Sequence, residues 1–406
     1  MTTIVIPVLI FSAVVVALAG IVLMARELLS PSGFVRVTIN GQRQIDAELG
    51  RMLLNVLADN GIYLPSGCGG RGTCGQCIVS LQNGLRPLLA TEAAHIGRRG
   101  ALAGQRLACM FRIRAPLEIS VPSEALEVRR LFCTVASNRN VATFLTELIL
   151  ELPPRESFEF EAGDYVMLEV PPYRLAFRDL DIEPRFRDDW QRLNLLALKS
   201  ELAAPTSRVY SLANPPQEKH KLMLVVRIAT PPPGAPLGTP PGIASSYIFG
   251  LKPGDTVTIS GPYGSFHAAD SDKEMVLIGG GAGIAPLRSI ILDQLERGTR
   301  RKLSFWYGSR DLRDLCYREE FEAAAAAHDN FEYHIALSQP RRDEDWDGLT
   351  GFIHAVVYEQ LLKAHPAPDE AEYYLCGPPL MSAAVIQMLE ELGVDDASIF
   401  FDDFGA

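Results

Sequence analysis

Residues 68–77 read CGGRGTCGQC, and a further cysteine, Cys109, follows 32 positions later. Three thiols in one glycine-rich loop and a fourth from a distant segment are typical of a [2Fe–2S] cluster, whose iron atoms bind four cysteine sulfurs. Glycines let such a loop turn its backbone N–H groups toward the sulfurs. The C-x5-C-x2-C spacing is one residue longer than the plant-type pattern. The sequence predicts that the cluster is bound by Cys68, Cys74, Cys77 and Cys109.

Two other uses of these cysteines compete with the cluster. Zinc sites usually pair two C-x2-C units, and this chain has one. Seven cysteines in 406 residues do not make a disulfide scaffold. We expect Cys133 and Cys316 to be plain buried residues.

The length of the chain limits the number of domains, and its net charge limits the classes of partner. A chain of 406 residues suggests two to four domains. The net charge of −11 argues against nucleic acid as a partner. It is compatible with docking onto a basic surface, although acidic solvated faces are common.

The N-terminal segment is apolar. Residues 4–25 carry no charge, and these 22 residues are enough to cross a bilayer. A signal peptide is an alternative, because residues 17–19 read ALA, but no basic region precedes the apolar run. A buried core helix is the other alternative. We predict a single transmembrane helix and linker over residues 1–32.

Three globular domains are expected after this segment. Strand, helix and strand patterns around the cysteine loop predict a β-grasp, ferredoxin-type domain over residues 33–126. Short alternating strands such as 165–170 and 222–227 predict an antiparallel β-barrel over residues 127–271. Residues 176–206 interrupt it as a polar connection, for which a lid, a docking loop, disorder or a surface excursion all stay open.

The third expected domain covers residues 272–406. A short apolar strand at 275–278 precedes the glycine run 279–283 and a helix over 286–296. Strands over 303–307 and 373–376 follow. Strands alternating with helices predict a doubly wound α/β domain with a parallel sheet.

A flavin site is expected on the barrel. Arg208, Tyr210 and Ser211 stand in an R-x-Y-S strand, which offers a guanidinium to a pyrophosphate, an aromatic ring to the flavin and a hydroxyl to its polar edge. Ser245 and Ser246 lie at a predicted helix N-terminus, whose free N–H groups suit a phosphate.

A nicotinamide site is expected on the α/β domain. Its glycine turn contains Gly279, Gly280, Gly281 and Gly283 and suits a phosphate. Cys376, Gly377 and Pro378 end a strand at the carboxyl edge, where open sheets bind ligands. Cys376 suits the meeting point of nicotinamide and flavin, or is a small buried thiol. Phe404, near the chain end, suits the flavin face, with core packing as the alternative.

The order of these motifs resembles the ferredoxin–NADP reductase superfamily: RVYS, GIASS, GGGAGIAP and CGPPLM. A ferredoxin unit before them resembles its oxygenase-reductase branch. The N-terminal apolar segment, the longer cysteine spacing and the stretches VRIATPPP, TISGPYG and DDFG make the whole chain similar to the family of F subunits of Na⁺-translocating NADH:quinone oxidoreductases.

The resemblance implies FAD and one [2Fe–2S] cluster as cofactors and NADH as substrate. It implies hydride transfer to FAD, single-electron transfer to the cluster, and onward transfer toward quinone through integral membrane subunits. Cys376, Ser211 and Phe404 would act beside the flavin. The expected location is the bacterial inner membrane, with the catalytic domains on the cytoplasmic side.

Some alternatives stay open in the residues themselves. Arg310 ends the strand after Ser309 with no acidic residue before Asp311, so a 2′-phosphate of NADPH is not excluded by the motif. An oxygenase reductase component and a non-enzymatic membrane electron carrier are the rival functions. The apolar N-terminus argues against the first, and the intact nucleotide motifs argue against the second.

Overall fold

The structure of this protein is a computed structural model, which describes Ile6, residues 11–21, Met24, 33–232, 234–236 and 238–402. Residues 11–21 are helical, and among the described residues no helix has both the length and the apolar character needed to cross a bilayer. The predicted anchor over residues 1–32 therefore falls largely outside the described residues. The chain divides into two compact units, residues 1–64 with 70–127, and residues 65–69 with 128–406.

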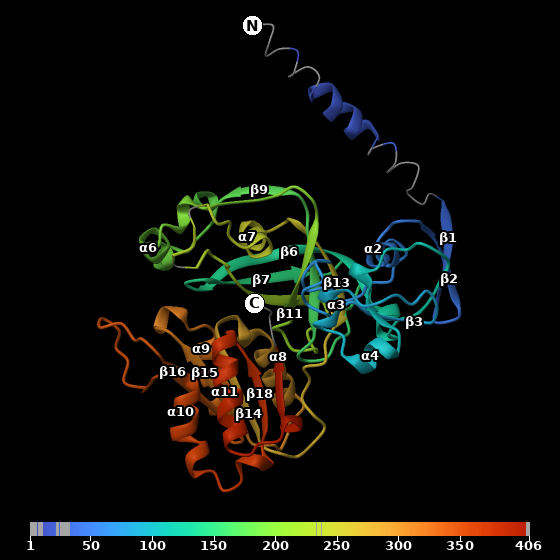
Figure 1. Cartoon of the computed structure of the whole chain (residues 1–406). Coiled ribbons are helices and arrows are strands. Elements are labelled where there is room, and N and C mark those ends of the chain that lie inside the picture. The colour runs from blue at the N-terminus through green and yellow to red at the C-terminus, as the bar shows by residue number, and fades with distance from the viewer. Residues whose placement is uncertain are drawn as a thin grey trace. The chain divides into compact units, whose positions relative to one another are not determined.

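The first unit is built on a mixed five-stranded sheet in the order β2-β1-β5-β3-β4. The strands are β1 (Phe34–Ile39), β2 (Arg43–Glu48), β3 (Ile78–Leu81), β4 (Gln105–Leu107) and β5 (Leu117–Ser120). The central pair β1 and β5 is parallel, and the other neighbours are antiparallel. Helix α2 (Leu53–Asp59) buries Leu53, Val56 and Leu57 in the core of the unit. This is the predicted β-grasp arrangement (Figure 1).

Short helical segments complete the first unit. They are α3 (Ala90–Ala93), α4 (Arg98–Leu102), η1 (Ala108–Met110) and α5 (Glu124–Glu127). The carboxylate of Glu92 in α3 is fully buried and accepts hydrogen bonds from the backbone N–H groups of Leu89 and Leu107. Since Leu107 lies in β4, this carboxylate joins the segment between β3 and β4 to the sheet.

The second unit begins with a six-stranded antiparallel sheet in the order β11-β8-β13-β6-β7-β12. Its strands are β6 (Arg129–Ala142), β7 (Leu145–Glu151), β8 (Tyr165–Val170), β11 (Thr206–Ser211), β12 (Lys221–Arg227) and β13 (Thr256–Tyr263). A bridge between Leu212 and Leu224 joins the end of β11 to β12 and closes the sheet into a barrel. Helix α7 (Ile243–Gly250) packs against the barrel core through Ala244 and Ile248.

The polar connection between β8 and β11 is folded. It contains the ribbon β9 (Tyr173–Ala176) with β10 (Lys199–Leu202), two short segments η2 (Phe177–Asp179) and η3 (Leu195–Ala197), and helix α6 (Pro184–Arg192). Trp190 is fully buried, and its indole N–H donates to the carbonyl of Thr143 at 2.7 Å. Of the alternatives that the sequence left open, disorder is wrong, because apolar side chains of the insertion are buried in a cluster with Ile228 and Phe249.

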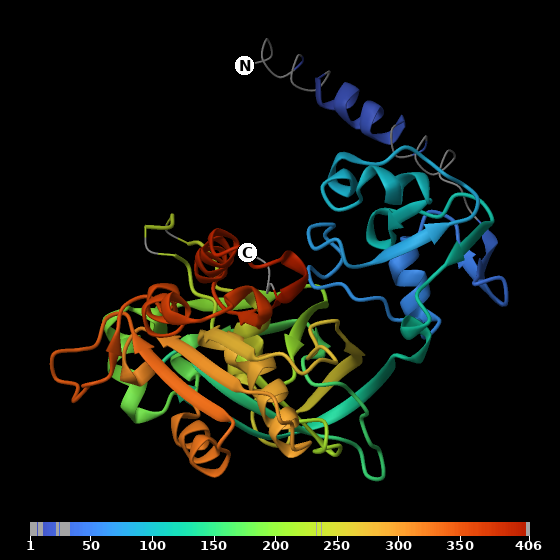
Figure 2. The same ribbon diagram turned by 90° about the horizontal axis from the view of Figure 1, so that it is seen from below.

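The C-terminal part of the second unit is a parallel six-stranded sheet in the order β17-β16-β15-β14-β18-β19. Its strands are β14 (Met275–Gly280), β15 (Leu303–Ser309), β16 (Phe331–Leu337), β17 (Leu349–Thr350), β18 (Glu372–Cys376) and β19 (Ile399–Asp402). Figure 2 shows β15 and β16 side by side among them.

Helices cover both faces of this parallel sheet. On one face, Leu277 and Phe305 pack with α8 (Ile284–Glu296) and α9 (Arg318–Ala327). On the other, Ile278 and Trp306 pack with α10 (Ile353–Gln360) and α11 (Pro379–Glu391). Alternate residues of a strand point to opposite faces, so strands covered on both sides are apolar throughout. This confirms the predicted doubly wound sheet, whose strand order reverses between β14 and β18.

Gly283 lies in the turn between β14 and α8 and allows this turn to pack closely on the end of β18. A Cβ atom at Gly283 would lie 2.0 Å from the carbonyl oxygen of Cys376 and 2.7 Å from the amide nitrogen of Gly377. These are backbone atoms, which cannot rotate away. The start of α8 therefore packs directly on the end of β18.

We expect Gly283→Ala to lower the melting temperature of the protein by roughly 3–10 °C, because the overlap with backbone costs about 1–3 kcal/mol. Differential scanning calorimetry measures this. Gly97→Ala is the control, because nothing lies within 4 Å of a Cβ there and the residue has a φ of −64°. Equal melting temperatures for the two variants would contradict the close-packing argument.

Candidate functional site

The cysteine loop lies beside the paired strands β3 and β4 of the first unit. Ile78 pairs with Leu107, and the N–H of Ala108 donates to the carbonyl of Cys77 at 2.8 Å. Cys77 and Cys109 thus leave neighbouring strand ends, and both are buried. A Cβ at Gly70 would lie 3.9 Å from the Cβ of Cys109, so the loop passes next to the fourth cysteine.

Two glycines of the loop are required by its path. Gly72 has φ +78° and Gly75 has φ +71°, which side chains rarely tolerate. An added Cβ would also lie 2.8 Å from the sulfur of Met110 at Gly72 and 2.8 Å from His95 at Gly75. This tight, turn-rich cradle and its soft sulfur donors fit a [2Fe–2S] cluster.

The complete ligand set stays a prediction. Cys68 and Cys74 are partly exposed, while the other two cysteines are buried. Within the described ranges, no three His, Cys, Asp or Glu side chains are grouped closely enough to hold a metal ion. The assignment of all four cysteines therefore rests on the sequence pattern and on the cradle.

The flavin motif lies on barrel strand β11, which pairs with β8 from Thr206 to Ser211. The guanidinium of Arg208 donates to the carbonyl of Ser207 at 2.6 Å and to the hydroxyl of Thr206 at 3.1 Å. Burial raises the pKa of Tyr210, so its ring is a neutral phenol at physiological pH. The strand thus offers one cation and one aromatic ring, a donor set that fits a flavin dinucleotide.

The two predicted serines lie in the first turn of α7. The hydroxyl of Ser246 donates to the carbonyl of Gly242 at 2.7 Å. The hydroxyl of Ser245 donates to the same carbonyl at 3.2 Å and accepts from the N–H of Ala229 at 3.1 Å. These hydroxyls fix the start of the helix against the chain after β12. The positive end of the helix dipole is the feature left for a phosphate.

The barrel strand and the parallel sheet meet at Ser211. Its hydroxyl donates to the carboxylate of Asp402 at 3.0 Å. Asp402 ends β19 and pairs in register with Cys376, which is fully buried at the end of β18. The predicted residues Ser211 and Cys376 therefore lie on segments that converge at one place, and Asp402 lies between them.

Asp402 was not among the predicted site residues. The signal in the sequence is its place directly after the last apolar strand, two positions before the aromatic Phe404. Phe404 itself lies outside the described residues.

A cavity of about 540 Å³ lies between the barrel and the parallel sheet, within the size range of small-molecule sites. It lies where strand order reverses, at the carboxyl ends of the parallel strands. Its walls come from both parts of the second unit. The barrel contributes Ala142, Phe144, Leu145 and Arg227, and the sheet contributes Gly280, Gly281, Gly308, Ser309, Arg310, Asp314, Ser338, Phe352 and Pro378, among others.

The predicted glycines divide into two groups. Gly280 and Gly281 line the cavity. A Cβ atom added at Gly281 would lie 3.9 Å from Nη1 of Arg227. Gly279, Gly283 and Gly377 instead allow close packing, since a Cβ at each would overlap a neighbour at 2.7 Å or less. Pro378 lines the cavity, as predicted for a site residue at this edge.

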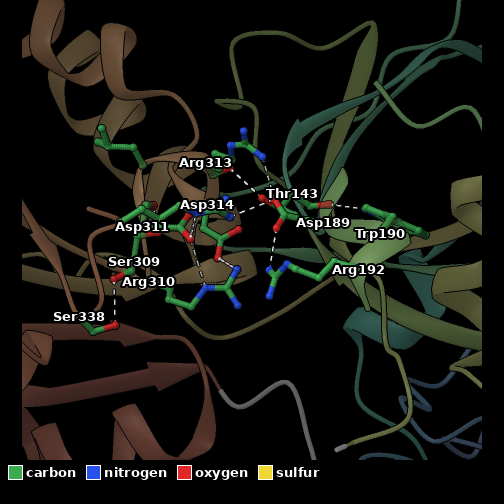
Figure 3. Close-up of polar contacts among 12 residues, drawn as sticks. Thr143, Asp189, Trp190, Arg192, Ser309, Arg310, Asp311, Arg313, Asp314 and Ser338 are labelled. Atoms are coloured by element: carbon green, nitrogen blue, oxygen red, sulfur yellow. Dashed lines mark hydrogen bonds and ion pairs between the residues drawn. The ribbon is translucent and has the colours of Figure 1, made fainter. Parts of the chain in front are cut away.

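A chain of charges borders the cavity at the end of β15 (Figure 3). Its centre is Asp189 of α6, whose side chain is 3% exposed. Arg192, Arg313 and Arg341 contact its carboxylate at 2.7, 3.0 and 3.0 Å. Burial alone would raise the pKa of Asp189, but the hydrogen bonds from these arginines lower it to about 2. The carboxylate is therefore charged at physiological pH. It joins the barrel insertion to Arg313 and Arg341 of the parallel sheet domain.

Cys133 and Cys316 are buried, as expected. Burial raises the pKa of each thiol to about 12. Both therefore stay protonated, and neither is suited to bind metal as a thiolate.

Three families match successive parts of the chain. Residues 37–114 match the 2Fe-2S iron-sulfur cluster binding domain, residues 194–268 the oxidoreductase FAD-binding domain, and residues 277–387 the oxidoreductase NAD-binding domain. These matches confirm the predicted FAD, cluster and NAD domains.

Two solved structures are similar to this protein along most of the chain. A cytochrome P450 reductase of Amycolatopsis, GcoB, has a TM-score of 0.64 and 28% identity, covering 91% of this chain and 98% of that one. The ferredoxin reductase in carbazole 1,9a-dioxygenase has a TM-score of 0.61 and 25% identity, covering 92% and 99%.

Curated relatives match more strongly and along the whole chain. The F subunit of the Na(+)-translocating NADH-quinone reductase of Methylococcus capsulatus is 52% identical over 406 residues, covering 100% of both chains. The corresponding chain of Klebsiella pneumoniae is 50% identical over 405 residues, covering 99% of both. The chain therefore belongs to the family of F subunits of the Na(+)-translocating NADH-quinone reductases, the NADH-oxidising subunits with FAD and 2Fe-2S domains.

Proposed function

We propose that this subunit brings electrons from NADH into a membrane complex by way of the Ser211–Asp402 meeting point. When bound, FAD takes the hydride of NADH and the cluster accepts electrons one at a time, so the flavin converts between the two. The supporting observation is that the Ser211 hydroxyl, on the flavin strand, contacts Asp402 beside the carboxyl end of the coenzyme sheet.

The chain's own residues hold the flavin in this proposal. Arg208 and the N-terminal end of α7, with Ser245 and Ser246 in its first turn, bind the pyrophosphate. Tyr210 would pack against the flavin ring, and Ser211 would form a hydrogen bond with its polar edge. Cys376, Asp402 and Phe404 would limit water and orient the nicotinamide.

The coenzyme occupies the 540 Å³ cavity. The turn Gly279–Gly283 and Arg227 hold its pyrophosphate, because Gly280, Gly281 and the Arg227 guanidinium line this wall. Gly377 and Pro378 border the nicotinamide. Phe352, which lines the cavity and is 69% exposed, offers a ring on which the adenine can stack.

The cluster and the membrane complete the route. Cys68, Cys74, Cys77 and Cys109 bind the [2Fe–2S] cluster. Residues 4–25 anchor the chain in the bacterial inner membrane by a single span, with the catalytic domains on the cytoplasmic side. Integral membrane subunits of the same complex take the electrons onward to quinone. The full-length similarity to the curated F subunits and the uncharged N-terminal run support this arrangement.

Replacing Cys77 with Ala tests the order of the carriers. We expect the visible absorbance of the cluster to be lost while NADH still bleaches the bound flavin, because the hydride site lies in the other unit. Stopped-flow spectroscopy measures both signals. Cys133→Ala is the matched control and should keep the cluster. If a folded Cys77→Ala protein no longer reduced its flavin, the proposed order would be wrong.

Removing residues 1–32 tests the membrane role. We expect the shortened chain in the soluble fraction, with NADH oxidation by an artificial acceptor retained. The tagged full-length chain, extracted from membranes in mild detergent, should co-purify with integral subunits and support Na⁺-stimulated quinone reduction. A full-length chain that purifies alone and reduces only artificial acceptors would favour the oxygenase-type reductase instead.

A further inference from the structure

The residue that follows β15 decides how a coenzyme's adenosine ribose is recognised. In doubly wound sheets this position carries an acid that binds the 2′-hydroxyl of NADH, or a nearby arginine that binds the 2′-phosphate of NADPH. This chain has Ser309 and Arg310 here, and both line the cavity. The residue types alone would favour NADPH, whereas the family oxidises NADH.

Arg310 forms ion pairs with two carboxylates. Its Nη2 lies 2.8 Å from Oδ2 of Asp314, and its Nε lies 3.5 Å from Oδ2 of Asp311. Both carboxylates are largely buried, with side-chain exposures of 20% and 4%. The positive charge of Arg310 is therefore already compensated before any coenzyme enters.

The ion-paired neighbours of Arg310 bring no excess positive charge, and Arg227, a fifth arginine that acts on Asp314, is the one assigned to the pyrophosphate. Asp311 is shared with Arg341, whose Nε lies 2.9 Å away, and Arg341 also contacts Asp189. The connected network has four arginines and four acids, which balance: Arg192, Arg310, Arg313 and Arg341 with Asp189, Asp311, Asp314 and Glu344. A phosphate dianion at this wall would add negative charge next to the carboxylates of Asp311 and Asp314.

A hydroxyl suits the same place. Nη2 of Arg310 is itself buried against Asp314, so the carboxylate is the group of this ion pair that is open to a coenzyme. Asp314 also lines the cavity. A hydroxyl can donate to this carboxylate, whereas an ionised phosphate only accepts.

We propose that Asp314 is the specificity-determining residue for the coenzyme: it neutralises Arg310 and accepts the 2′-hydroxyl of NADH, and it repels the 2′-phosphate of NADPH. The proposal deepens the proposed function, since it rests on the coenzyme occupying the 540 Å³ cavity.

Asp314→Asn tests this directly, because it removes the charge and keeps the shape. We expect the ratio of kcat/KM for NADH to that for NADPH to fall by about tenfold or more, since a released Arg310 can pair with phosphate. Asp329→Asn, which removes one exposed charge from the same domain away from the cavity, should leave the ratio unchanged. Adding Arg310→Leu to Asp314→Asn should abolish the gain in NADPH use.

A binding measurement gives a second readout that does not depend on the flavin. Calorimetry with 2′,5′-ADP and with 5′-ADP should show tighter binding of the 2′-phosphate compound to Asp314→Asn than to the unaltered chain, with 5′-ADP binding retained as evidence of folding. A ratio within twofold of the unaltered value, or a gain that survives Arg310→Leu, would overturn the proposal. Failure of the unaltered chain to oxidise NADH would instead overturn the proposed function.

Discussion

The buried carboxylate of Asp189 is the constraint on which the arrangement of the second unit depends. It lies in an insertion of the barrel, yet two of its three arginine partners belong to the parallel sheet domain. A carboxylate that is 3% exposed stays charged only because these cations surround it. The ion cluster thereby holds the barrel insertion against the parallel sheet domain. Hydride transfer requires this, because two rings held on separate domains react only when they are aligned.

The elements of the fold were largely predictable because their signals are local. The expected strand 275–278 and helix 286–296 agree with β14 and α8 to within two residues. An uninterrupted apolar run followed by glycines is a signal that needs no distant partner. The insertion between β8 and β11 was less accessible, because its helix is polar by composition and its core depends on a few residues such as Phe186 and Trp190.

The candidate site divides in the same way. Motif residues such as Arg208, Ser211 and the glycine turn could be found from their order along the chain. Asp402 could not be assigned a role, since its contact with Ser211 joins positions 191 residues apart. Arg310 was conspicuous in the sequence, but its residue type alone pointed toward NADPH. Whether an arginine binds a phosphate depends on the carboxylates beside it, which the sequence did not identify. Asp314, four positions later, became relevant only when the turn after β15 brought the two together.

The buried cysteines have a consequence for the durability of the protein under oxidative stress. Peroxides attack thiolates rather than thiols. With pKa values of about 12, Cys133 and Cys316 are ionised to roughly one part in 10⁵ at neutral pH. They are also sealed inside the barrel and the sheet domain. Oxidative damage to cysteine should therefore begin at the partly exposed Cys68 and Cys74 rather than in the nucleotide-binding core.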